Sequence, residues 1–153
     1  MRPFLFILLS GLTMTACRNS GQNTASEPKT QAVPVSGLRE IIVDADRQLG
    51  TEVDFSVLQW RAVRDTLLVI VRYSGGCEEH YFNAYFSGAW LKSLPPQTIV
   101  SLEHLNPKKD PCRSLVKDTL RFDMRPLRYE SGNEVVVKWS GDPGKLARYR
   151  YGK

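Results

Sequence analysis

Short runs of β-branched and aromatic residues recur along the chain from residue 53 onward, and Gly, Pro, Asp and Asn separate them. Runs of this length and spacing are typical of β-strands joined by short turns. Seven of them predict an all-β fold, a single antiparallel β-sandwich of about the size of an immunoglobulin domain. The predicted strands cover residues 53–63, 66–74, 80–87, 97–105, 119–124, 134–140 and 146–151.

Alternation within the runs predicts which faces are buried. Leu120 and Phe122 fall on one side of their run and the charged residues between them on the other, which indicates a strand with one buried face. Between residues 66 and 73, apolar residues occupy both the odd and the even positions, which predicts a central strand covered on both faces. Arg64-Asp65 is the expected tip of the hairpin that leads into it.

Upstream of the strands, apolar residues at helical spacing between residues 38 and 49 predict a short helix that ends at Gly50. The three consecutive β-branched residues Ile41-Ile42-Val43 could equally begin a strand. The pattern leaves both alternatives open.

The first 16 residues have the pattern of a secretory signal, because Arg2 precedes an apolar stretch at residues 4–9 and small or short polar residues follow it. The stretch is too short for a membrane-spanning helix, which needs about 20 apolar residues. Met14-Thr15-Ala16-Cys17 resembles the lipobox of bacterial lipoproteins, in which the cysteine is acylated and begins the mature chain. The resemblance implies a membrane anchor of the palmitate type at Cys17.

Three segments follow from this organisation. Residues 1–16 are the expected signal peptide, residues 17–36 the lipidated cysteine and a flexible tether rich in Ser, Thr, Asn, Gln and Pro, and residues 37–153 the β-sandwich domain. Arg18 stands where an aspartate favours retention in the inner membrane of enterobacteria. The resemblance therefore implies the outer membrane, at its periplasmic face.

Composition narrows the function classes. The chain has 153 residues, of which 42% are hydrophobic and 24% charged, so collagen, long coiled coils and general disorder are excluded. It has only 2 His and 3 Cys, which leaves few conventional metal ligands or nucleophiles. We therefore expect no cofactor and no enzymatic activity.

The most distinctive segment is Gly75-Gly76-Cys77-Glu78-Glu79-His80-Tyr81-Phe82, followed by Leu94-Pro95-Pro96 and by Asp110-Pro111-Cys112. It resembles a family of small uncharacterised Gram-negative lipoproteins with a Gly-Gly-Cys-x-x-His-x-Phe motif, a Ser-Leu-Pro-Pro turn and a downstream Asp-x-Cys. The resemblance covers roughly residues 53–153. It implies the architecture and the location of the protein and no mechanism.

Cys77 and Cys112 allow three interpretations. A disulfide is favoured, because exported chains meet an oxidising compartment and lipidation of Cys17 leaves an even pair. A zinc site is the first alternative, with Cys77, His80, His104 and Cys112 as four ligands. A periplasmic thiol enzyme is the second, with Cys77 as nucleophile and His80 as base.

The charged and histidine residues near the motif have two interpretations each. His80 is in phase with Phe82 and His104 with Leu102, so both are expected to point inward and to have structural roles, with binding as the alternative. Glu78 and Glu79 are expected in a solvated turn rather than as a pair of catalytic acids.

Two further sets of side chains are candidates for binding. Arg148 and Arg150 share one side of the last strand, where they could contact lipid headgroups or simply form a solvated edge. Trp60, Trp90 and Trp139 could form a sugar-stacking platform, although tryptophan in a strand-rich domain is more often in the core. We expect no nucleic-acid partner for an exported protein.

The sequence thus predicts a lipid-anchored lipoprotein of the cell envelope that acts as a binding or structural module. An envelope glycan, a lipid headgroup or another protein is the candidate ligand. The alternative is a zinc-binding or thiol-based periplasmic enzyme.

Overall fold

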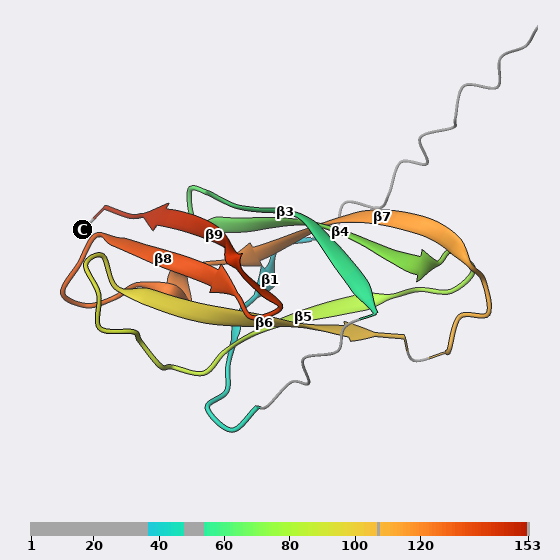
Figure 1. The fold of residues 1–153 in the computed structure, drawn as a ribbon, viewed down its shortest axis with the longest axis horizontal. Helices are drawn as coiled ribbons and strands as arrows, with labels where there is room; N and C mark the ends of the chain where they lie inside the picture. Colours follow the sequence, from blue (N-terminus) through green and yellow to red (C-terminus); the bar gives the residue numbers. More distant parts are fainter. Residues whose placement is uncertain (1–36, 48–53, 107, 153) are drawn as a thin grey trace, which may run out of the picture. The chain divides into compact units, whose positions relative to one another are not determined.

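The computed structural model describes residues 37–47, 54–106 and 108–152, which form two β-sheets packed face to face (Figure 1). The expected signal peptide, Cys17 and the tether lie outside the described residues. The expected β-sandwich is confirmed. None of the described segments is a helix long and apolar enough to cross a membrane. The elements are β1 (Arg39–Glu40), β2 (Ile42–Val43), β3 (Phe55–Val63), β4 (Thr66–Gly75), β5 (Tyr81–Phe86), β6 (Gln97–Leu105), β7 (Ser114–Asp123), the 3-10 turn η1 (Arg125–Leu127), β8 (Glu134–Trp139) and β9 (Asp142–Arg150).

The strands are divided between a four-stranded sheet, in the order β1-β7-β4-β3, and a five-stranded sheet, in the order β2-β5-β6-β8-β9. Both sheets are mixed rather than wholly antiparallel, because β1 pairs with β7, β2 with β5 and β6 with β8 in parallel. The chain leaves β6 for β7 in the other sheet and returns at β8, so β8 lies beside β6 in the same direction. A hairpin would have forced the antiparallel arrangement.

The core fills the space between the two sheets. Phe82, Phe122 and Tyr149 are among its largest side chains and are 0% exposed. Trp60 of β3 donates its Nε1–H to the backbone oxygen of Val137 in β8 at 3.0 Å. That bond joins the two sheets through the core, where a buried indole N–H needs an acceptor.

The helix expected between residues 38 and 49 is wrong over its described part. Residues 39–43 are extended, and β1 and β2 extend one sheet each by pairing with β7 and β5. Ile41, between the two short strands, is 1% exposed and belongs to the core. Pairing with two sheet edges therefore outweighed the helical spacing, while Leu49 and Gly50 lie outside the described residues.

The predicted strands agree with the structure except for the first residues of β7 and β9 and the predicted burial of one face of β4. β7 begins at Ser114 and β9 at Asp142, both earlier than expected, because residues 114–118 pair with β4 and Asp142 pairs with Trp139 of β8. β4 is central, as predicted, between β7 and β3. Its outer face is not covered, because Leu68 and Ile70 there are only half-buried.

Candidate functional site

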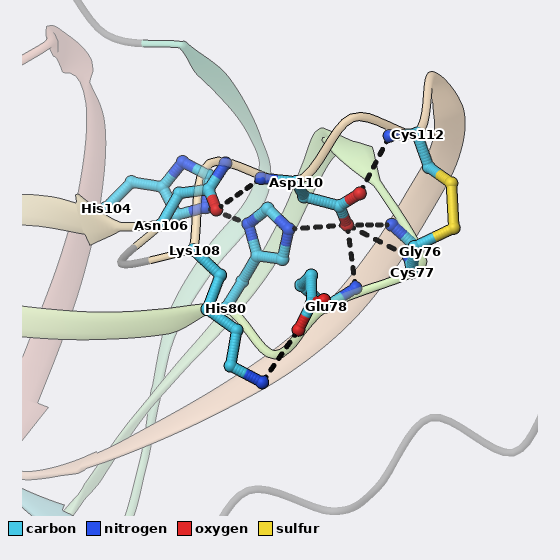
Figure 2. Close-up of polar contacts among 9 residues, drawn as sticks. All are labelled: Gly76, Cys77, Glu78, His80, His104, Asn106, Lys108, Asp110 and Cys112. Atoms are coloured by element: carbon cyan, nitrogen blue, oxygen red, sulfur yellow. Dashed lines mark hydrogen bonds and ion pairs between the residues drawn. A yellow bond between two sulfur atoms is a disulfide. The ribbon is translucent and has the colours of Figure 1, made fainter.

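The Gly-Gly-Cys-x-x-His and Asp-x-Cys residues gather at one end of the sandwich, where the turn from β4 to β5 meets the connection from β6 to β7 (Figure 2). Leu94-Pro95-Pro96 lies at the other end of β6, just before its first residue Gln97. Cys77 in the turn and Cys112 in the connection form a disulfide with Cα atoms 5.8 Å apart. The pairing favoured from the sequence is confirmed. It ties two loops that are 35 residues apart in the chain.

The carboxylate of Asp110 lies at the centre of this arrangement, and its side chain is 0% exposed. It accepts N–H groups from both tied loops: Oδ2 accepts from Gly76 at 2.8 Å, Cys77 at 2.9 Å, Glu78 at 3.0 Å and His80 Nε2 at 3.1 Å, and Oδ1 accepts from Cys112 at 2.8 Å. Desolvation raises the pKa of Asp110, but the backbone N–H groups and His80 outweigh it and hold the pKa well below its usual range. Asp110 is therefore an ionised anchor for both loops.

The two glycines of the motif make room for this arrangement. A Cβ on Gly75 would lie 2.5 Å from His80 Nε2 and 3.1 Å from the Asp110 carboxylate, too close for a side chain. Gly76 has a φ of 114°, which L-residues with a side chain rarely adopt. The turn with positive φ that leads into Cys77 was expected from the sequence and is confirmed.

His80 and His104 form the middle of a hydrogen-bonded chain with an aspartate at each end. His80 Nε2 contacts Asp110 at 3.1 Å, His80 Nδ1 contacts His104 Nε2 at 2.8 Å, and His104 Nδ1 contacts Asp54 Oδ1 at 2.8 Å. The two imidazole side chains are 1% and 3% exposed, and the His104 ring stacks on Phe82. Both histidines point inward, as expected.

All four ring nitrogens of the two histidines are engaged in this chain. An ionised carboxylate only accepts hydrogen bonds, so the nitrogens that face Asp110 and Asp54 carry protons. The remaining nitrogen of each ring faces the other ring. No ring nitrogen is left to serve as a general base or to bind a metal ion.

The zinc and thiol-enzyme alternatives both need free thiolates. The ligand atoms of Cys77, Asp110 and Cys112 lie within 4.8 Å of one another, as a metal site would require. The two sulfur atoms, however, are bonded to each other, and N–H donors surround the Asp110 oxygens. The ring nitrogens of His80 contact Asp110 and His104, and those of His104 contact His80 and Asp54. The four proposed ligands therefore meet as a structural cluster.

Glu78 and Glu79 lie in the turn between β4 and β5. Glu78 forms an ion pair with Lys108 at 2.8 Å (Figure 2), and Glu79 accepts a hydrogen bond from the Tyr81 hydroxyl. Each carboxylate thus has its own partner at the surface. The solvated turn expected from the sequence is confirmed.

Arg148 and Arg150 share one side of β9, as the alternation predicted, and Tyr149 lies fully buried on the other. Both arginines contact Glu134 of β8, at 3.1 and 3.0 Å. Hydrogen bonds from Arg150 and then Arg148 lower the pKa of Glu134. The C-terminal basic side chains are thus partly neutralised within the domain.

The three tryptophans do not form a common platform. Trp60 and Trp139 are 7% and 6% exposed and belong to the core, whereas Trp90 is half-buried against Phe86 and Tyr129. The core assignment is confirmed for the first two. A flat stacking surface made of all three is wrong, because the sandwich buries two of them.

Sequence reasoning missed Asp110 and Asp54, which hold the histidine chain at its two ends. The available signal for Asp110 was its place two residues before Cys112. Asp54 carries no such signal, since it is 50 residues from His104 in the chain and 69% exposed at its side chain.

Comparison with known proteins gives a likeness of fold. The sequence matches no protein family, and no curated protein matches it. Among solved structures, a NigD-like immunity protein from Bacteroides caccae is 14% identical with a TM-score of 0.50 over 67% of this chain and 51% of that chain. A toxin-related protein from Parabacteroides distasonis is 18% identical with a TM-score of 0.48 over 74% and 59% of the two chains, and a protein of unknown function from Bacteroides vulgatus is 16% identical with a TM-score of 0.49 over 76% and 56%. The chain thus spans 51–59% of the length of these proteins, and its likeness to the Bacteroides caccae protein shows a shared β-sandwich architecture.

Proposed function

We propose that the chain is an exported bacterial lipoprotein, anchored in the outer membrane through acylated Cys17, whose β-sandwich is a binding module of the cell envelope. The signal-like residues 1–16 and the lipobox-like residues 14–17 support the export and the anchor. Two or more acyl chains hold a protein stably on a membrane. The tether at residues 18–36 separates the anchor from the domain.

The disulfide between Cys77 and Cys112 is the observation that carries this proposal. Disulfides persist in oxidising compartments such as the periplasm and are rare in the cytosol. Of the 3 cysteines, the disulfide uses two, and Cys17 is the third. The number of cysteines therefore agrees with export and lipidation together.

Binding is favoured over catalysis by the chemistry of the motif. Both motif cysteines are in the disulfide, and the nitrogens of both motif histidines are engaged in hydrogen bonds. A nucleophile with an adjacent base, which covalent catalysis requires, is therefore missing from this cluster. The cluster stabilises the loops of a domain that presents charged sheet faces to its surroundings.

Replacing the anchor residue tests the proposal directly. The wild-type chain, expressed in a Gram-negative bacterium, should partition into the detergent phase, incorporate labelled palmitate and fractionate with outer membranes. Cys17→Ser should abolish the palmitate label and the acyl-dependent mass. The matched control, Cys77→Ser with Cys112→Ser, removes the other two cysteines and should keep the label. Equal palmitate incorporation by wild type and Cys17→Ser would contradict the anchor.

A further inference from the structure

The outer face of the four-stranded sheet carries four basic side chains, Arg61 of β3, Arg72 of β4, and Lys117 and Arg121 of β7, which we call the basic face. The strand register places them in two rows. Arg72 lies directly opposite Lys117, while Arg61 and Arg121 lie on either side of Leu68. Since Leu68 and Arg72 are four positions apart on one strand, the rows are about 13 Å apart.

The basic face is not neutralised by the described part of the protein. All the ion pairs that the described residues form involve other cations, including Arg148 and Arg150 on β9. Of the two aspartates of β7, Asp123 binds Arg125, and Asp118, beside Lys117, accepts a hydrogen bond from the backbone N–H of Thr119. Four positive charges thus remain without an intramolecular counterion among the described residues.

The pairing of Arg72 with Lys117 is unfavourable for the isolated fold. Like charges directly opposite each other on neighbouring strands repel and destabilise a sheet. Arg72 and Lys117 are cross-strand partners on the exposed side of β4 and β7. An anionic ligand between the two side chains would be attracted to both and would reduce the repulsion between them.

A depression at this end of the sheet adds groups that suit phosphate. It measures about 520 Å³ and is lined by Arg72 together with the hydroxyl-bearing Ser56 and Ser74. Ser56 lies directly opposite Arg72 on β3, and Ser74 is two residues along the same side of β4. Guanidinium and hydroxyl groups are the usual protein partners of phosphate oxygens. Asp54 also lines the depression, and its carboxylate contacts Nδ1 of His104.

Exposed apolar side chains lie among the cations. Leu115, opposite Ser74, is 71% exposed, and Leu58, at the bulge of β3, is 45% exposed. A broad sheet face that combines cations with apolar side chains suits an extended anionic surface with an apolar interior beneath its charges. A membrane leaflet rich in anionic headgroups is such a surface.

We propose that the basic face docks on the phosphate groups of an anionic membrane surface, with Arg72 and Lys117 at its centre. The inference rests on the proposed membrane anchor, because a tethered domain is held close to the headgroups. Docking would then orient the domain with the four-stranded sheet against the membrane and the β2-β5-β6-β8-β9 sheet away from it. The C-terminal arginines, already paired with Glu134, are not part of this contact.

Vesicle binding by the full chain tests the inference without the lipid anchor. The chain with Cys17→Ser is sedimented with phosphatidylcholine vesicles and with vesicles of equal parts phosphatidylcholine and phosphatidylglycerol. The apolar segment at residues 4–9 contributes to both measurements, so the ratio of the two partition coefficients isolates the charge effect. The ratio should be well above one and should fall towards one as salt rises, because exposed charges are screened.

Charge substitutions then locate the contact. Each Lys or Arg at an anionic surface strengthens binding about fivefold, so Arg72→Gln with Lys117→Gln should lower the ratio about 30-fold. The matched control, Arg148→Gln with Arg150→Gln, removes the same charge and should lower it far less. Arg61→Gln with Arg121→Gln provides a second test of the basic face. Thermal unfolding shows whether each variant is folded. Arg72→Gln with Lys117→Gln should not lower the melting temperature, since it removes a repulsion between like charges.

The outcomes separate this inference from the proposed function. A ratio of one for the chain with Cys17→Ser alone, or an equal loss from the basic-face pair and the β9 pair, would overturn the docking surface. Palmitate labelling at Cys17 would still stand in that case. The opposite outcome is a wild-type chain without a palmitate label whose Cys17→Ser form still has a high partition ratio that depends on Arg72 and Lys117. That result would refute the lipid anchor and support a peripheral membrane-binding face.

Discussion

Removing the disulfide should destabilise the domain by an amount that follows from the length of the closed loop. Cys77 and Cys112 are 35 residues apart, so the cross-link closes a loop of about 36 residues. In the chain-entropy description this loop reduces the entropy of the unfolded chain by about 13 cal/mol/K, or about 3.8 kcal/mol at 25 °C. For a domain of about 115 residues, unfolding entropy of about 0.24 kcal/mol/K converts that loss into a melting temperature lower by about 16 °C.

The measurement is equilibrium unfolding in urea and by heat, without reductant, of wild type, Cys77→Ser, Cys112→Ser and the double variant. Each single substitution removes the same cross-link, so the three variants should lose similar stability. Losses that add up in the double variant, or melting temperatures that stay within a few degrees of wild type, would refute the reasoning.

A substitution of Asp110 tests whether its carboxylate and the disulfide stabilise the same two loops together. It accepts N–H groups from Gly76, Cys77 and Glu78 on one loop and from Cys112 on the other, so it links the segments that the disulfide links. Asp110→Asn should therefore have a different effect in the oxidised protein and in the double serine variant. Additive effects would mean that the carboxylate and the disulfide act independently.

Two further predictions concern the histidine chain and the carboxylates that are paired with arginines. His80→Phe leaves Asp110 and His104 each short of one hydrogen-bond partner and should lower the free energy of unfolding in urea by about 1–3 kcal/mol, whereas an unchanged value would show that the histidine chain does not stabilise the fold. Hydrogen bonds from arginine side chains lower the pKa values of Asp123 and Glu134, so the stability they contribute is present above their unfolded pKa values near 4 and is lost as pH falls through the lower folded values. The free energy of unfolding in urea should accordingly fall below about pH 4. Asp110→Asn lacks one of the carboxyl groups with a lowered pKa, so its free energy of unfolding should fall less steeply with pH. A fall as steep as that of wild type would show that Asp110 does not contribute to the pH dependence.

Local pattern alone located most of the fold. Runs of β-branched and aromatic residues between turn residues located the strands β3 to β9. Alternation gave the buried faces of β7 and β9, because a strand shows opposite faces at successive residues whatever its partner is. The glycines at 75 and 76 marked a turn with positive φ, and an even pair of cysteines indicated the disulfide. These features depend on residue type and short spacing, which the sequence shows directly.

The tertiary structure determined which strands pair and which polar groups contact each other. Strand direction followed from the route of the chain between sheets, so the parallel pair of β6 and β8 had no local signal. Residues 39–43 became extended because two sheet edges were available to them. The role of Asp110 depends on amides 32 to 34 residues away, and the cations of β9 found Glu134, whereas those of the outer sheet face found no described carboxylate. Hydrophobic alternation determines which face a residue occupies, but the partner of a polar group is determined only when distant segments meet.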